Sequence, residues 1–105
     1  MAQFDVHRNP GAQKAVIPYV VVVQSRRFDL ARRRVVIPLV VQSAIQSPDP
    51  VFNPAFEIEG SAVVLNPLHM VSMAVDRMGE HVGSLKKDGD RVIAAIDLLI
   101  TRAWD

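Results

Sequence analysis

The chain has 105 residues, a formal net charge of +1, hydrophobic side chains at half of its positions, and no cysteine. This length predicts a single domain over residues 1–105, and the hydrophobic share excludes a disordered chain. Disulfides and thiolate metal sites are excluded, and the small net charge offers no general attraction to nucleic acid or membranes. No apolar run is long enough to span a membrane and no signal-peptide pattern is present, so we expect a cytoplasmic protein.

Two segments near the N-terminus predict β-strands. Residues 2–8 alternate, with Phe4 and Val6 on one side, as in a half-buried strand. Residues 17–24 contain a run of β-branched apolar residues, which is typical of a strand covered on both faces. We therefore expect a second layer or a second subunit to cover Val22.

The middle of the chain combines a further strand, a proline-rich loop and a hairpin. Residues 35–41 predict a strand, in which Pro38 lacks a backbone N–H group and indicates an edge or a bulge. Residues 43–54 contain three prolines and predict an irregular loop with at most one short helical turn. The segments 56–58 and 62–65 flank a Glu-Gly step, which predicts a β-hairpin.

The last third of the chain predicts a weak strand and then a helix. Residues 70–78 alternate imperfectly and are followed by a glycine. Asp88 or Ser84 can cap the helix, whose apolar face is expected to hold Val92, Ile93, Ile96, Leu99 and Ile100. About six strands followed by one helix predict a mainly β fold, an antiparallel sheet or small barrel with a C-terminal α-helix packed on it.

Motifs for metal or nucleophilic chemistry are weak. His7, His69 and His81 are far apart in the sequence without ligand spacing, and we interpret them as surface or loop residues. The pair Glu57 and Glu59 is interpreted as solvated, because catalytic carboxylate pairs are much rarer. The chain has neither a glycine-rich phosphate loop nor a nucleophile elbow, and we expect no cofactor.

The strongest charge feature is the arginine cluster Arg26-Arg27 and Arg32-Arg33-Arg34. One interpretation is a contact with phosphate or RNA, because guanidinium groups suit phosphate geometry. The other, which the small net charge favours, is a solvated loop that pairs with Asp29 or with an acidic partner peptide. Trp104 is either an interface anchor or part of a frayed terminus.

Five segments together show a characteristic order and spacing. They are Met1-Ala2-Gln3-Phe4-Asp5-Val6, Val21-Val22-Val23-Gln24-Ser25, Arg33-Arg34-Val35-Val36-Ile37-Pro38-Leu39, the stretch from Pro54-Ala55-Phe56-Glu57-Ile58 through Ser72, and Ile93-Ala94-Ala95-Ile96-Asp97-Leu98-Leu99-Ile100. With these segments the chain resembles the CcdB family of plasmid and chromosomal toxins over nearly its whole length.

The resemblance implies a homodimer with an SH3-like barrel sheet of the CcdB/MazF type, a small extra sheet and a C-terminal helix. It also implies a toxin without catalytic activity, belonging to a type II toxin–antitoxin system. Such a toxin binds the dimerisation domain of the DNA gyrase A subunit and traps gyrase on cleaved DNA. A CcdA-like antitoxin neutralises it through a disordered C-terminal segment that folds on the toxin. DNA is contacted only indirectly, through gyrase or the antitoxin.

The family's gyrase-binding surface combines the end of the closing helix with two residues that follow the Gln-Ser step. Carried over by position, it consists of Arg27, Phe28, Asp97, Ile100, Thr101, Arg102 and Ala103. The best-known family pattern ends in Trp-Gly-Ile where this chain has Thr101-Arg102-Ala103, and we hypothesise that Trp104 takes over the stacking role. Two alternatives stay open: an endoribonuclease toxin of the MazF or Kid type, with the arginine cluster on RNA, and a degenerate toxin that retains only antitoxin binding.

Overall fold

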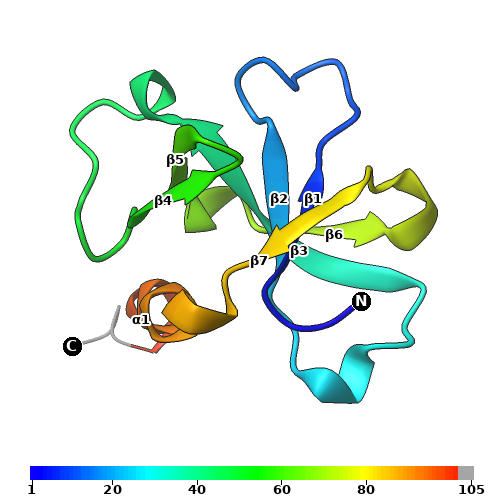
Figure 1. The fold of residues 1–105 in the computed structure, drawn as a ribbon. Coiled ribbons are helices and arrows are strands. Elements are labelled where there is room, and N and C mark those ends of the chain that lie inside the picture. Colours follow the sequence, from blue (N-terminus) through cyan, green and yellow to red (C-terminus); the bar gives the residue numbers. More distant parts are fainter. Residues whose placement is uncertain (102–105) are drawn as a thin grey trace.

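The fold is a curled, half-barrel sheet with a C-terminal helix at its lower edge, as Figure 1 shows. The computed structural model describes residues 1–101. Within this part, the regular elements are β1 (Asp5–Arg8), β2 (Tyr19–Val22), β3 (Arg33–Val41), β4 (Ala55–Ile58), β5 (Ser61–Leu65), β6 (Val71–Ala74), β7 (His81–Ser84) and α1 (Gly89–Ile100). The strand order is β4-β5-β3-β2-β1-β7, every pairing is antiparallel, and β6 joins the sheet through β3. The predicted mainly β fold with a C-terminal helix is confirmed.

Strand β3 is the longest in the described chain and organises the sheet. One of its edges pairs with β2, while its other edge pairs first with β6 and then with β5. The prediction that Pro38 marks an edge strand is wrong, because β3 is paired along both of its edges. The Pro38 carbonyl accepts a hydrogen bond from Asn66 N at 3.0 Å, on the side where the β6 ladder has ended and the β5 ladder begins. The missing N–H group therefore falls in the gap between two ladders.

A second apolar layer covers the outer face of β2, as the sequence predicts. Val22 is fully buried and packs with Val20 and Val36. This small cluster is covered by the side chains of Met1, Met73 and Met78. The residues that cover Val22 therefore come from the same chain. Methionine suits this role because its unbranched side chain adapts readily to an irregular surface.

The main core lies between the other face of the sheet and α1. Val92 and Ala95 are fully buried in it, and Ile96 packs against it. The predicted helix face is therefore partly wrong, because Ile93 is 44% exposed and Ile100 is 59% exposed. The buried stripe is narrower than the apolar pattern of the sequence, and small Ala95 lets the helix lie close to the sheet.

The start of α1 differs from the predicted capping. Asp88 occupies the N-cap position but makes no side-chain capping bond, and its carboxylate lies 3.7 Å from Arg91 Nη1 instead. Ser84 Oγ accepts from Lys86 N at 3.1 Å, in the short turn that precedes the helix. Gly89 lies against the ring of Phe4, where a Cβ atom would be 2.6 Å from Phe4 Cε2.

The N-terminal segment bends before it enters the sheet. Phe4 has a φ of 71°, so the strand begins at Asp5 and the prediction of a strand from residue 2 is wrong. Asp5 N donates to Ala2 O at 3.1 Å, while Ala2 N donates to the Asp5 carboxylate at 2.9 Å. Phe4 in turn bridges two elements, since its N–H donates to Val22 O at 2.6 Å and its carbonyl accepts from Leu85 N at 2.9 Å.

The predicted hairpin is confirmed as β4 and β5. Glu59 has a φ of 51° and Gly60 a φ of 78°, so both central residues adopt the left-handed conformation that a tight hairpin turn favours. The proline-rich stretch is irregular, as predicted, with a short 3-10 turn at Gln42–Ala44 and a further turn closed by Asn53 N, which donates to Asp49 O at 2.6 Å. The sequence prediction missed β7, whose four residues include a glycine. No helix within residues 1–101 is long and apolar enough to cross a membrane.

Candidate interaction site

The described end of α1 brings three of the predicted gyrase-binding residues together. Asp97, Ile100 and Thr101 are all exposed. Thr101 closes the helix, because its N–H and its hydroxyl both donate to the Asp97 carbonyl at 2.9 Å, and the hydroxyl also donates to the Asp97 carboxylate. Ile100 is thus held on the surface by an ordered helix end. Three further predicted residues, Arg102, Ala103 and Trp104, lie outside the described residues.

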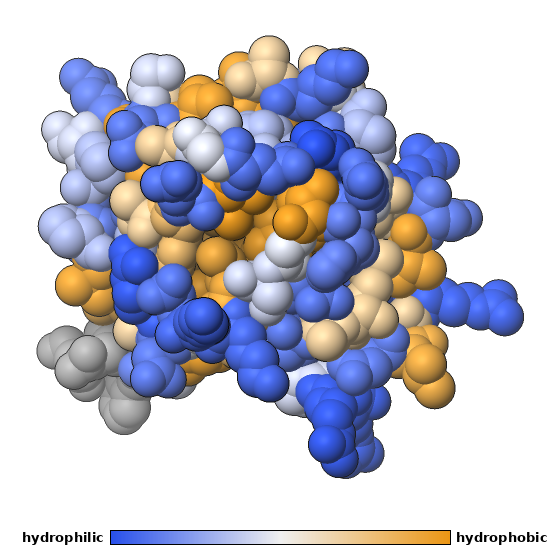
Figure 2. Space-filling view, viewed as in Figure 1, coloured by the Kyte–Doolittle hydropathy of each residue, from blue (hydrophilic) through white to orange (hydrophobic). Residues whose placement is uncertain are grey.

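The other two predicted residues lie on the short turn Arg26–Phe28, between β2 and β3. Arg27 is exposed and Phe28 is 43% exposed, while Leu30 of the same loop is 97% exposed. Figure 2 shows apolar side chains next to strongly hydrophilic ones at the lower right, where Figure 1 draws this loop. A surface that mixes exposed apolar groups with guanidinium groups suits a protein partner, since aromatic and arginine side chains are enriched at interfaces.

A buried arginine holds this loop in place. Arg34 is fully buried, and its Nε donates to Gln24 Oε1 at 2.8 Å. Its Nη1 donates to the carbonyl of Met1 and lies 3.5 Å from the carbonyl of Asp29. The same Gln24 oxygen accepts from Val35 N at 3.0 Å. Arg34 therefore connects β3 to the start of the loop, to Asp29 within it, and to the N-terminus.

This position corrects the interpretation of the arginine cluster as a uniformly solvated loop. Arg34 is buried, whereas Arg26, Arg27, Arg32 and Arg33 are exposed. Within residues 1–101, no arginine of the cluster forms the predicted ion pair with the carboxylate of Asp29. Arg34 contacts the backbone carbonyl of Asp29 instead. The alternation of side chains along a strand could have predicted this burial. Arg34 lies two residues before Val36, so the two side chains share a face of β3, and Val36 is buried.

Within one chain, the structure does not bring the two groups of predicted residues together. Figure 1 draws the turn Arg26–Phe28 at the lower right and α1 at the lower left of the molecule. A partner that contacts both groups must therefore span the lower side of the protomer or meet residues from two protomers.

One of the three histidines differs from the predicted surface positions. His7 is buried in β1, and its Nδ1 lies 3.0 Å from the carbonyl of Gly79. Its ring meets the ring of His81 edge-on at 5.3 Å between centroids, and His81 Nε2 lies 3.5 Å from a carboxylate oxygen of Asp5. The two histidines are brought together by the β1–β7 pairing. His69 and His81 are exposed, as predicted. No group of three or more potential ligands in the described residues could hold a metal ion.

Glu57 and Glu59 are both exposed, as expected, but Glu59 also takes part in a polar network. Tyr19 Oη donates to Glu59 Oε1 at 2.8 Å, and Arg8 Nη2 donates to Glu59 Oε2 at 2.7 Å. Burial, followed by the hydrogen bond to Glu59, raises the pKa of Tyr19 above its usual value. A hydrogen bond to Glu80, which is 3.2 Å away, is the main cause that raises the pKa of Arg8. These contacts hold the β4–β5 turn against β1 and β2.

Comparison with known proteins places the chain in a family. A search of curated proteins found no match. The family model described as CcdB protein matches residues 3–101. This match covers nearly all of the described chain, including the turn Arg26–Phe28 and the whole of α1. The chain therefore belongs to the CcdB family.

Proposed function

We propose that this chain is the toxin of a type II toxin–antitoxin system, acting in the cytoplasm on the DNA gyrase A subunit. It binds the dimerisation domain of that subunit and traps the complex of gyrase with cleaved DNA. The observation that carries the proposal is the CcdB family match over residues 3–101, which includes the turn Arg26–Phe28 and the described end of α1 through Thr101. Such an action requires a binding surface and no catalytic residue in the toxin.

The exposure of the described contact residues supports this site. Ile100, at the end of α1, is 59% exposed although it is a large apolar residue. Burying such a side chain against a partner contributes roughly 1–2 kcal/mol to binding. Phe28 offers an aromatic contact on the turn, and Arg27 next to it can pair with a carboxylate of the partner.

The separation of these groups within one protomer supports a homodimer as the active form. A two-fold dimer presents two helix ends and two turns, so a symmetric partner can meet both groups at once. We further propose that a CcdA-like antitoxin neutralises the toxin by folding a disordered segment onto the dimer.

The proposal is tested by a gyrase cleavage assay with supercoiled plasmid, ATP and the purified chain. Three proteins are compared with the unmodified chain: I100D, V51D and a form that lacks Trp104 and Asp105. Val51 is a matched control, because it is 55% exposed and lies in the proline-rich loop outside both predicted groups. We expect linear DNA from the unmodified chain and from V51D, and at least about tenfold less from I100D, which places a charge in an apolar contact. The truncated form should also lose activity if Trp104 takes over the stacking role.

The outcomes distinguish the proposal from its alternatives. A folded, dimeric chain that produces no linear DNA at any concentration would refute the gyrase mechanism. If it still binds a CcdA-like antitoxin, it is a degenerate toxin. Cleavage of RNA in metal-free buffer would instead favour an endoribonuclease of the MazF or Kid type. Equal loss in I100D and V51D would show that the helix end is not the contact.

A further inference from the structure

A pocket of about 240 Å³ lies where the N-terminal segment meets two short turns, Arg26–Phe28 and Lys86–Asp88. Its lining consists of Ala2, Gln3, Phe4, Arg26, Asp29 and Lys86. Figure 1 draws the N-terminal segment between the loop at the lower right and the start of α1. Pockets for drug-sized ligands begin at about 300 Å³, so this pocket suits a smaller ligand.

Hydrogen bonds between distant segments hold the walls of this pocket together. Phe4 N donates to Val22 O at 2.6 Å, and the Phe4 carbonyl accepts from Leu85 N at 2.9 Å, directly before the second turn. Gln3 Nε2 donates to the carbonyl of Val23 at 3.1 Å, close to the first turn. Because these bonds fix the walls in advance, a ligand does not have to order them on binding.

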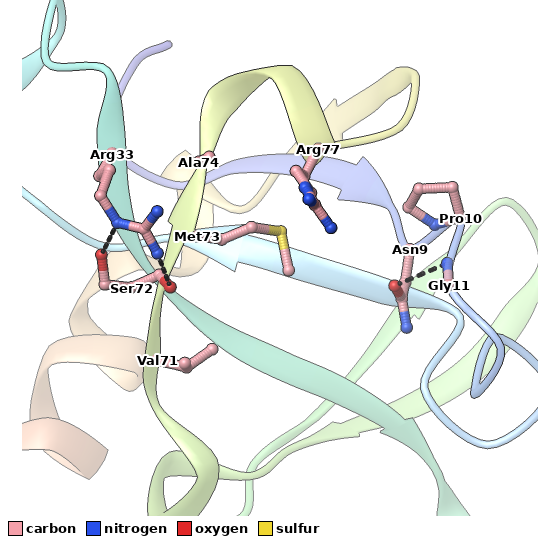
Figure 3. Close-up of a pocket in the computed structure, with 9 residues that line it drawn as sticks. All are labelled: Asn9, Pro10, Gly11, Arg33, Val71, Ser72, Met73, Ala74 and Arg77. Atoms are coloured by element: carbon pink, nitrogen blue, oxygen red, sulfur yellow. Dashed lines mark hydrogen bonds between the residues drawn. The ribbon is translucent and has the colours of Figure 1, made fainter.

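Two cationic side chains from different elements converge on the pocket. Arg26 and Lys86 are exposed, and neither forms an ion pair within residues 1–101. Arg33 illustrates the contrast, because its Nε donates to Ser72 Oγ at 3.0 Å and its Nη2 donates to the Ser72 carbonyl at 2.9 Å, as Figure 3 shows. A guanidinium group and an ammonium group that share one pocket suit an oxyanion, since both donate charge-assisted hydrogen bonds.

Asp29 is the one carboxylate among the six lining residues, and it restricts the charge of the ligand. Its Oδ1 atom is buried and has no hydrogen-bond partner within residues 1–101, so this oxygen is turned away from the open pocket. Two cations against one carboxylate give the lining a formal charge of +1. A phosphate monoester carries a charge of about −1.5 to −2 at neutral pH and can bind both cations despite the repulsion from Asp29. A singly charged carboxylate or phosphodiester gains less.

We propose that this pocket binds a small phosphate monoester. The phosphoryl oxygens bind Arg26 and Lys86, while the organic group packs beside Ala2 and the ring of Phe4. The size of the pocket selects a small molecule, and its pair of cations selects a dianion.

This binding does not rest on the gyrase proposal. The lining contains none of the residues that we propose for gyrase binding, although Arg26 directly precedes Arg27 and Phe28 in the same turn. A direct measurement of ligand binding therefore tests the inference whether or not the chain poisons gyrase.

The test is an NMR titration of the isotope-labelled full chain with phenyl phosphate at about pH 7.5, where this ligand is mostly a dianion. Benzoate and diphenyl phosphate serve as singly charged probes that carry the same ring. The key variants are R26Q, K86Q and D29N. R32Q and K87Q are the matched controls, because each removes an exposed cation that lies outside the lining.

We expect phenyl phosphate to bind with a dissociation constant on the order of 1 mM and to shift the amide resonances of Gln3, Phe4 and Lys86. Affinity should fall about threefold to tenfold in R26Q and in K86Q, and rise about twofold to fivefold in D29N, because that change removes a like charge from the pocket. R32Q and K87Q should stay within about twofold of the unmodified chain, and both singly charged probes should bind more weakly.

Four results would each overturn the proposal. They are the absence of binding at about 10 mM phenyl phosphate, unchanged affinity in R26Q and K86Q, an equal loss in R32Q and K87Q, and weaker binding in D29N. The amide spectra of the variants show in the same experiment that each variant is folded.

Discussion

Replacing Arg34 by alanine should destabilise the protein far more than the same change at its neighbour Arg33. Arg34 is fully buried and bonds to Gln24 Oε1 at 2.8 Å and to the carbonyl of Met1. Within residues 1–101, the exposed side chain of Arg33 donates hydrogen bonds only to Ser72. Bonds from a charged donor contribute about 1.5–3 kcal/mol each, and truncation also leaves a cavity and unsatisfied acceptors. We therefore expect a loss of about 4 kcal/mol for R34A and less than about 1 kcal/mol for R33A.

Urea denaturation and thermal melting measure this difference directly. A loss of about 4 kcal/mol corresponds to roughly 20 °C in the melting temperature of a chain of this size. All variants are compared at one protein concentration, because association would make stability concentration-dependent. The reasoning is refuted if R34A loses no more stability than R33A, since the buried network would then be dispensable.

Three further predictions follow from individual contacts. The raised pKa of Tyr19 means that its neutral form stabilises the fold fully below about pH 10 and that this contribution is lost as the pH rises through the folded pKa. Since the chain has a single tyrosine, tyrosinate absorbance should titrate above about pH 10 in the folded protein, and Y19F should flatten the decline in unfolding free energy there. G89A should cost about 1–3 kcal/mol by chemical denaturation, because its Cβ would lie 2.6 Å from the ring of Phe4, whereas G83A meets no atom within 4 Å and should cost less. V22A should cost about 2 kcal/mol, and a loss below about 0.5 kcal/mol would contradict the burial of the second layer.

The exposed helix end and the loop at Arg26–Phe28 show how much of the candidate site can be predicted from sequence. The order and spacing of five segments along the chain indicate the CcdB family, and that resemblance gives the positions to examine. Whether the side chains are available depends on packing: Ile100 and Ile93 belong to the apolar pattern of the helix, yet both are exposed. Sequence periodicity cannot distinguish an apolar helix residue in the core from one that stays on the surface.

The sequence by itself determined the elements whose signals are local. The valine run of β2, the Glu-Gly hairpin and the amphipathic helix all follow from side-chain alternation, turn conformation and helical period. Only the tertiary structure decided the features that depend on distant segments. The pairing of β1 with β7 brings His7 to His81, and the gap between the β5 and β6 ladders accommodates Pro38. Burial of Arg34 likewise depends on acceptors from Gln24, Asp29 and Met1, which only the folded chain assembles around it.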